Sequence, residues 1–270
     1  MTIVWDQLVL LIQVAGWRFD YFDRSIPIAL PIINTTTFFT TILLTFLHCT
    51  LNVRVFSFTS VLIIYSMSFF LYALTFPIVL GACDGKIKAT WRAHARTPLE
   101  AYQQFVVFSA AVFMLQGMGL SLINTIPLGS LNQSLAFVDV WILDNIPVLP
   151  AYFIGIMLMI FGFVIKLWGY TLIGIELHYY KDMFLDKKAD VGFVKQGIFL
   201  YTDNPIYGLG NLQLYGLAIM NRSLVGFVAG ILSQVAIFVF YWLWEKPFLR
   251  KMYGNQGSAS SMGDTAGILD

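Results

Sequence analysis

The sequence predicts an all-α integral membrane protein with about six transmembrane helices. The 270 residues are 58% hydrophobic and only 11% charged, whereas soluble domains carry roughly 25% charged residues. The charges are also segregated, and six windows contain no Asp, Glu, Lys or Arg: 25–53, 55–83, 101–138, 145–165, 204–221 and 223–244. Each window is close to or above the ~20 residues that cross ~30 Å of hydrocarbon as a helix.

The segments outside these windows divide the chain. Residues 3–17 are apolar but too short to span, and Trp5 and Trp17 suit headgroup depth, so an N-terminal interfacial helix is expected. The N-terminus lacks the basic region and cleavage site of a secretory signal peptide. We therefore predict an N-terminal membrane region with three spans over 1–145, a core over 146–253, and a disordered tail over the small, polar residues 254–270.

The basic residues predict the orientation. They lie before the first window, between the second and third, between the fourth and fifth, and after the last: Arg18, Arg24, Lys86, Lys88, Arg92, Arg96, Lys181, Lys187, Lys188, Lys195, Lys246, Arg250 and Lys251. The positive-inside rule then places both termini in the cytosol, at the endoplasmic reticulum of a eukaryote or the inner membrane of a bacterium. A net charge of +1 provides no field that would recruit nucleic acid. The two cysteines have no neighbour at metal-ligand spacing, so no metal site is expected.

A polar turn opens the fifth window. Pro205 disfavours the α conformation at Asn204 and suits the first position of a helix. An ordinary helix start would explain both residues equally well. Tyr207, Gly208 and Gly210 favour a second interpretation, because two glycines in the first turn would leave a groove with free backbone N–H groups. Such a groove suits a carboxylate or a flat adenine ring.

Two further places concentrate polar groups at the same membrane face. Glu245 directly follows the uncharged window 223–244, and it is either solvated or paired with the ammonium of a ligand. Gly169 and Gly174 would allow close helix approach, and Glu176 and His178 lie where the fourth span ends. An interfacial belt of aromatic residues is the alternative explanation of this second region.

The spacing of these elements resembles a known family. The turn Asn204-Pro205-Ile206-Tyr207 is followed by Gly216-Leu-Ala-Ile-Met220 and then by Glu245-Lys-Pro-Phe248. This pattern, over roughly 150–253, is similar to the C-terminal core of the phosphatidylethanolamine N-methyltransferases. These belong with the isoprenylcysteine carboxyl methyltransferases, which have Arg-His-Pro-x-Tyr at the turn. The sequence departs from the family at Lys246, where a second acidic residue is usual, and its glycine-rich cofactor segment is echoed only loosely.

The resemblance implies transfer of a methyl group from S-adenosylmethionine to a phospholipid amine at the cytosolic face. The residues expected to contact this cofactor are Gly169, Gly174, Asn204, Pro205, Tyr207, Gly208, Gly210 and Glu245. Glu176 or His178 would accept the proton that the amine must lose. Candidate cations for the lipid phosphate are Lys166, Lys181 and Arg92, and candidate aromatic faces are Tyr179, Tyr180, Tyr201 and Tyr207.

Three other functions stay open from the sequence. The first is methylation of an isoprenylcysteine or another lipid with the same cofactor. The second is an NADPH-dependent steroid reductase of the membrane, although that family has Gly-Glu after the tyrosine where this chain has Gly208-Leu209. The third is a transporter or scaffold, and the absence of a broken span with paired charges argues against transport.

Overall fold

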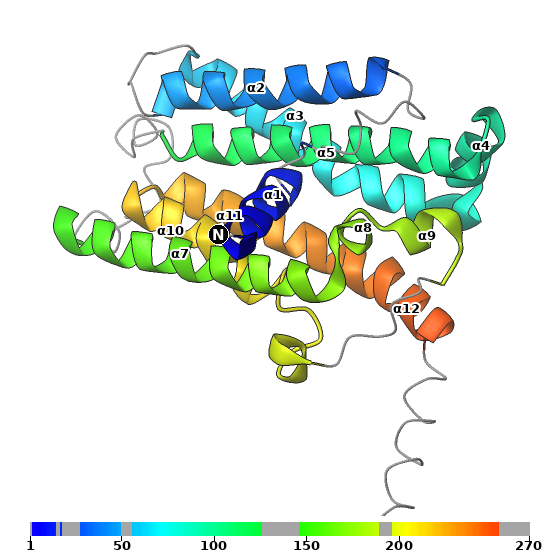
Figure 1. Ribbon diagram of the computed structural model, residues 1–270. Coiled ribbons are helices and arrows are strands. Elements are labelled where there is room, and N and C mark those ends of the chain that lie inside the picture. The colour runs from blue at the N-terminus through cyan, green and yellow to red at the C-terminus, as the bar shows by residue number, and fades with distance from the viewer. Residues whose placement is uncertain are drawn as a thin grey trace, which may run out of the picture.

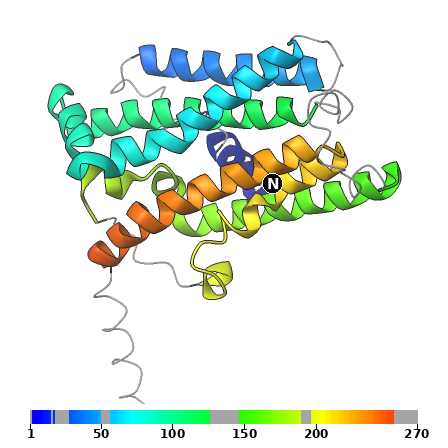
Figure 2. The ribbon, with the colours of Figure 1, turned by 180° about the vertical axis from the view of Figure 1, so that it is seen from behind.

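The computed structural model describes residues 2–14, 17, 28–49, 56–125, 146–188 and 196–253. These residues contain helices and no strand, which confirms the all-α class. One layer holds α2 (Ala29–Cys49), α3 (Phe58–Phe76) and α5 (Pro98–Ile123), and the other holds α7 (Val148–Ile173), α10 (Leu212–Met220) and α11 (Leu224–Phe240) (Figure 1). Seen from behind, α3 runs obliquely to α5 within the first layer, and α11 runs obliquely to α7 within the second (Figure 2).

Five helical segments in the described part of the chain are long and apolar enough to cross a bilayer: Ala29–Leu47, Phe58–Gly81, Pro98–Ile123, Val148–Ile173 and Leu224–Tyr253. Two of them contain a π-helical turn, at Pro77–Gly81 and at Tyr241–Glu245. The sixth expected span, 204–221, contains only the nine-residue helix α10. The turn at its start and a short 3-10 helix, Leu209–Asn211, take up the residues that a full-length span would need.

Helix α5 forms the centre of the fold. It packs against α2, α3, α4 (Lys86–His94), α9 (Lys181–Leu185) and α11. Its start is well defined, because Pro98 occupies the first turn and the Thr97 hydroxyl accepts a hydrogen bond from the Glu100 backbone N–H. On its buried face, Phe105 stacks on Phe184 with ring centroids 4.7 Å apart. The N-terminal and C-terminal halves of the chain therefore share one core.

A row of glycines joins α7 to the segment that follows the turn. Gly155, Gly162 and Gly169 recur every seven residues and lie on one face of α7. A Cβ atom on Gly155 would lie 2.6 Å from the carbonyl oxygen of Gly216 on α10. One on Gly162 would lie 2.5 Å from the backbone nitrogen of Gln213. The backbones of α7 and α10 can approach this closely only because side chains are absent.

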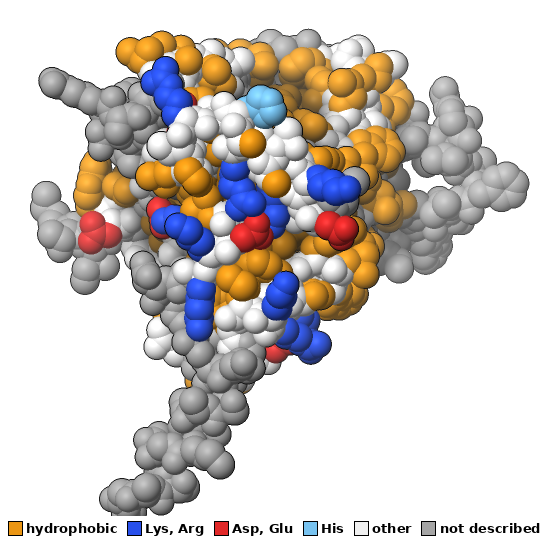
Figure 3. Space-filling view, turned by 90° about the vertical axis from the view of Figure 1, so that its right-hand side faces the viewer, with side chains coloured by type: hydrophobic (Ala, Val, Ile, Leu, Met, Phe, Trp, Pro, Cys, Tyr) orange, Lys and Arg blue, Asp and Glu red, His pale blue; other side chains and the backbone are white. Residues whose placement is uncertain are grey.

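One end of the bundle carries most of the charged groups. Helices α4, α8 (Ile175–His178), α9 and α12 (Lys246–Tyr253) lie at this end, where Lys and Arg are interspersed with Asp and Glu (Figure 3). Asp186 links two of these helices: its carboxylate accepts hydrogen bonds from Lys88 at 2.5 Å and Arg92 at 2.8 Å. The Lys88 ammonium also donates to the carbonyl of Met183. These contacts hold α4 against the end of α9.

Helix α1 (Thr2–Val14) contacts α7 and α8, and the Tyr179 hydroxyl donates to the carbonyl of Gln13. The expected N-terminal interfacial helix is thus a helix that packs on the bundle. The expected tail, 254–270, lies outside the described residues.

We predict that Gly155→Ala lowers the free energy of unfolding by about 1–3 kcal/mol, because the new methyl group forces α7 and α10 apart. The matched control is Gly117→Ala on α5, where a Cβ meets no atom within 4 Å. This control should be neutral or stabilising by up to ~1 kcal/mol through helix propensity. Unfolding of both variants in the same detergent measures the difference, and equal effects would contradict the close approach.

We further predict a pH-dependent effect of Asp186→Asn. Burial raises the pKa of Asp186, but Lys88 and Arg92 lower it more, so that its folded pKa lies below the ordinary value. The ion pairs therefore stabilise the fold above roughly pH 4, the unfolded pKa, and this contribution is lost as the pH falls through the folded pKa. Because Asp186 is half-exposed, solvent screening weakens the ion pairs, and Asp186→Asn should lower the free energy of unfolding at pH 7 by about 1 kcal/mol. Denaturant unfolding at pH 7 and in acid measures the effect. The difference in free energy of unfolding between Asp186→Asn and wild type should disappear in acid. The control Asp84→Asn, at an exposed residue, should unfold with the free energy of wild type at both pH values.

Candidate functional site

The polar turn and the glutamate meet at the charged end of the bundle. The Tyr207 hydroxyl donates a hydrogen bond to the Glu245 carboxylate at 3.1 Å, across 38 positions of sequence. This contact confirms that the two elements lie at the same depth. Glu245 ends the π-helical turn Tyr241–Glu245, and π turns within helices occur frequently at functional sites. Glu245 makes no ion pair with any cation among the described residues.

The turn closes on itself through backbone hydrogen bonds. The Asn204 side chain accepts from the Tyr207 N–H at 3.0 Å, and its carbonyl accepts from the Gly208 N–H at 3.1 Å. The Gly210 N–H donates to the carbonyl of Pro205 at 2.8 Å. The prediction of free N–H groups is therefore wrong for these three residues, because the turn satisfies its own donors. Asn204 caps the turn, as in an ordinary helix start.

A glutamine in the apolar helix α11 binds the backbone of the turn. The Gln234 amide nitrogen donates to the carbonyls of Tyr207 at 3.1 Å and Gly208 at 3.4 Å. Its amide oxygen accepts from the Tyr215 hydroxyl. Sequence reasoning missed Gln234, and its signal was a lone amide inside the uncharged window 223–244.

A second tyrosine extends the junction. The Tyr180 hydroxyl lies 2.9 Å from that of Tyr207. Burial, followed by the nearby charge of Glu245, raises the pKa of both tyrosines well above the ordinary value, so both hydroxyls keep their protons. Because Tyr207 has one proton and donates it to Glu245, Tyr180 must donate to Tyr207. The order of donation is Tyr180 to Tyr207 to Glu245.

An outer cavity lies at this junction. Its empty volume, together with space that is open to the surroundings, is about 920 Å³. Its wall includes three carboxylates, Asp182, Asp203 and Glu245, together with Asn204 and Tyr207. Asp203 pairs with Lys246 at 2.6 Å, and Asp182 accepts a hydrogen bond from the Tyr253 hydroxyl. Glu245 is thus the wall carboxylate best placed to meet a positively charged ligand.

An inner cavity of about 1050 Å³ adjoins the outer one. The two share five wall residues: Tyr170, His178, Tyr180, Ile206 and Tyr207. The remaining wall comes from α3, α5, α7, α10 and α11 and includes the buried polar residues Gln116, Asn211 and Ser233. Lys166 also lines this cavity and has no ion-pair or hydrogen-bond partner among the described residues. The cavities therefore carry opposite charges on either side of a shared aromatic wall.

The structure brings three of the expected cofactor residues to the outer cavity: Asn204, Tyr207 and Glu245. Its wall does not include the other five: Gly169, Gly174, Pro205, Gly208 and Gly210. Gly169 packs on Ile206, where a Cβ would lie 2.6 Å from the side chain, and Gly210 packs under the aliphatic stem of Lys166. Gly174, at φ 81°, ends α7 and faces open space. The positions of Gly169, Gly174 and Gly210 are thus explained by packing and backbone geometry.

The two expected proton acceptors differ in placement. Glu176 is exposed, pairs with Lys181 at 2.5 Å and lines neither cavity. His178 lines both cavities. Its ring stacks on Phe113 at a centroid distance of 5.2 Å and contacts the tilted ring of Tyr170 at 4.5 Å. Burial, with a smaller contribution from Lys166, lowers the pKa of His178 to about 3. The ring is therefore neutral, and its Nε2 atom is buried without a hydrogen-bond partner.

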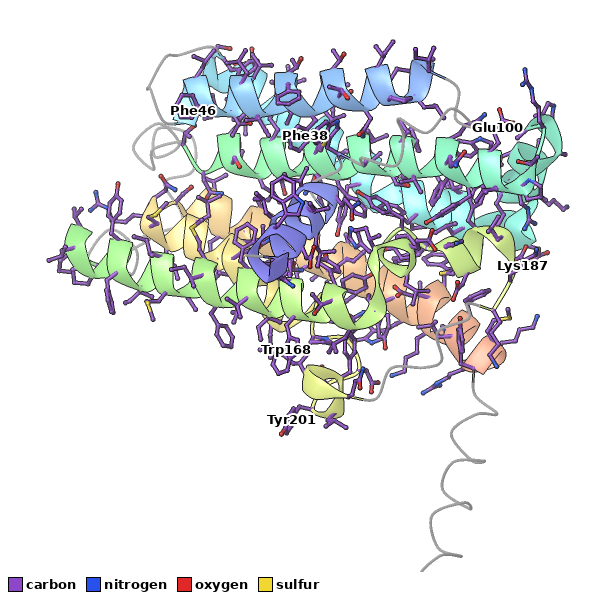
Figure 4. The ribbon with its side chains drawn as sticks, viewed as in Figure 1. Phe38, Phe46, Glu100, Trp168, Lys187 and Tyr201 are labelled. Carbon is purple, nitrogen blue, oxygen red and sulfur yellow. The ribbon has the colours of Figure 1, made fainter. Side chains whose placement is uncertain are left out.

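The remaining candidates lie away from the cavities. Arg92 is engaged with Asp186, and Tyr179 is buried with its hydroxyl on Gln13. Tyr201 is 88% exposed and points away from the bundle next to the 3-10 helix Gly197–Leu200 (Figure 4). Of the aromatic candidates, Tyr180 and Tyr207 are the ones that reach both cavities.

Comparison with known proteins identifies the part of the chain that builds the junction. Residues 150–256 match the family described as phospholipid methyltransferase. Two similar proteins are the phosphatidylethanolamine N-methyltransferases of Komagataella phaffii, 27% identical over 128 residues, and Schizosaccharomyces pombe, 36% identical over 77 residues. The matched parts are 47% and 28% of this chain.

These relatives are much longer proteins. The matches span 13% and 8% of their length, respectively. No solved structure matches the chain. Residues 150–256, which hold the Asn204 turn, Tyr207 and Glu245, are thus the part of this chain that is similar to the phospholipid methyltransferase family.

Proposed function

We propose that the protein transfers a methyl group from S-adenosylmethionine to the amine of a phospholipid headgroup, phosphatidylethanolamine or its mono- or dimethyl form. The observation that carries the proposal is Glu245, a carboxylate oriented by Tyr207 that has no cationic partner in the described chain and lines an open cavity. A carboxylate in such an apolar setting is unfavourable unless a cation joins it. Residues 150–256 match a methyltransferase family, and the methyl donor that we propose for it, S-adenosylmethionine, is such a cation.

The charge of the outer cavity suits the proposed cofactor. S-adenosylmethionine carries positive charge on its sulfonium and its ammonium, and when bound it supplies an electrophilic methyl group. Glu245 would hold the ammonium, and Asn204 and Tyr207 would fix neighbouring polar groups at the mouth. The same wall is unfavourable for NADPH, because its phosphates would face the carboxylates of Asp182, Asp203 and Glu245.

We propose that the reaction takes place at the shared wall, between the two cavities. Tyr170, Tyr180 and Tyr207 offer ring faces and hydroxyls where positive charge develops on the acceptor nitrogen. The chain's contribution is alignment and exclusion of water, since the acceptor must lie in line with the methyl group.

The acceptor amine must lose a proton before it can attack. Of the two expected acceptors, His178 is the one at the shared wall, where neutral Nε2 can accept a hydrogen bond from the amine. A ring with so low a pKa does not retain the proton, so the proton passes to solvent through the open outer cavity. Glu176, held by Lys181 outside both cavities, would act only indirectly.

We propose that the charged end faces the cytosol, in agreement with the positive-inside rule. Both termini would then be cytosolic, in the endoplasmic reticulum of a eukaryote or the inner membrane of a bacterium. Residues 146–253 would form the methyltransferase core, and 1–145 would complete the bundle around it.

Incubation of the purified protein with S-adenosylmethionine and vesicles containing phosphatidylethanolamine tests the function directly. Mass spectrometry of the lipids should show a methylated headgroup. An isoprenylcysteine acceptor in the same assay should remain unmodified. Methylation of that acceptor alone would contradict the proposed substrate class.

We predict that Glu245→Gln weakens S-adenosylmethionine binding about ten- to a hundredfold. The change removes a charge-assisted hydrogen bond worth roughly 1.5–3 kcal/mol but keeps the shape of the side chain. Equilibrium binding to the folded variant measures the effect. Glu100→Gln is the matched control, because it removes the same charge at the start of α5, outside both cavities. Unchanged affinity in Glu245→Gln would assign Glu245 a structural role.

A further inference from the structure

The inner cavity contains an unusual set of polar groups for the interior of an apolar bundle. Lys166 brings a positive charge into the last third of the membrane-spanning helix α7 and meets no counter-ion in the described chain. A lysine at such a depth is unfavourable by several kcal/mol unless an anion or water joins it. A bound anion is the partner that would stabilise this residue most.

Hydrogen-bond acceptors complete the set. Gln116 is 4% exposed and donates through its amide nitrogen to Ser233 at 2.7 Å, but its amide oxygen has no partner. The amide oxygen of Gln213 and the Nε2 atom of His178 are likewise buried without partners. All three residues line the cavity that Lys166 lines. Buried acceptors without donors are rare in native proteins, and here they call for a ligand with N–H or O–H groups.

The cavity reaches the lateral surface of the bundle. Gly117 on α5 and Phe163 on α7 belong to its wall, and both are exposed on the apolar flank. A Cβ on Gly117 would meet no atom within 4 Å. A ligand with hydrocarbon tails could therefore leave its tails in the bilayer, between α5 and α7, while its polar part occupies the cavity.

We propose that the inner cavity binds a zwitterionic lipid headgroup, with the phosphate on Lys166 and the amine on the acceptors of Gln116, Gln213 and His178. This inference rests on the proposed function and names the acceptor site for it. The amine then lies beside the shared wall, adjacent to the outer cavity. Helix α5, outside the segment that matches the family, contributes Gln116 and the portal residue Gly117 to substrate recognition.

The test is equilibrium binding of short-chain lipids to the full chain in micelles, without cofactor. Phosphatidylethanolamine, phosphatidic acid and diacylglycerol present phosphate plus amine, phosphate alone, and neither. Wild type should bind them in that order of decreasing affinity. Lys166→Met, which keeps the stem that packs on Gly210, should lose at least tenfold affinity for both phosphate-bearing lipids. Lys86→Met, on exposed α4, is the matched control and should bind as wild type does.

Two further variants separate the parts of the site. Gln116→Leu should weaken phosphatidylethanolamine binding roughly fivefold or more and leave phosphatidic acid binding unchanged, because only the amine loses its acceptor. Gly117→Leu should weaken all three lipids by filling the portal. S-adenosylmethionine binding should stay within about twofold of wild type in each variant, which also reports that the variants are folded.

The outcomes distinguish this proposal from the proposed function. If wild type methylates phosphatidylethanolamine but Lys166→Met and Gly117→Leu bind lipid normally, the acceptor site lies elsewhere and the inference is overturned. If Lys166→Met loses cofactor binding and keeps lipid binding, Lys166 belongs to the cofactor site, which also overturns it. If lipid binding depends on Lys166 while no methyl transfer occurs, the inference stands and the proposed function fails.

Discussion

The hydrogen bond from Tyr207 to Glu245 is the constraint on which the site depends. It joins a turn at the start of one hairpin arm to the end of the other, across 38 positions. Two supports make it possible: Gln234 holds the carbonyls of the turn from α11, and Asn204 closes the turn with its side chain. Since each support satisfies a backbone group that would otherwise be unpaired in an apolar bundle, losing either would displace the tyrosine. A full-length helix over 204–221 could not present Tyr207 in this way, which explains why the sixth span is short.

Two groups of opposite charge line adjoining cavities and form no ion pair with each other. Glu245 lines the outer cavity and Lys166 the inner one, and the tyrosines of the shared wall stand between the two cavities. Each charge is unfavourable in its apolar setting, and a direct ion pair would relieve both. The proposed function assigns the position of Glu245 to a cation and the position of Lys166 to an anion, with the reacting atoms between them. Two unpaired buried charges lower the free energy of unfolding, and binding of a cation and an anion would restore it.

The sequence was sufficient for the membrane class and for the expectation that the turn and Glu245 lie at one end of the bundle, because both rest on local signals: long uncharged windows, and polar residues at their ends. It was insufficient for the walls of the cavities. Gln116 and Gln234 look like isolated polar residues in apolar helices, and only the packing of α5 and α11 shows which carbonyls and cavities they face. The role of the glycines was ambiguous for a related reason. Gly169 and Gly210 allow close approach of Ile206 and Lys166, and sequence spacing alone does not tell a close protein contact from a close ligand contact.

The helices that precede the matched segment form part of the inner cavity. They carry no motif of the family, yet α3 and α5 supply Tyr72, Phe113 and Gln116 to the inner cavity. The matched segment alone would leave that side of the cavity open to the bilayer, since α7, α10 and α11 cover only the other side. A methyl acceptor held on one side only could not be kept in line with the donor, and alignment is the main contribution that a protein makes to this reaction. In the proposed function, the segment that matches the family forms the donor side and carries Lys166, and the preceding helices determine which headgroup can align with them.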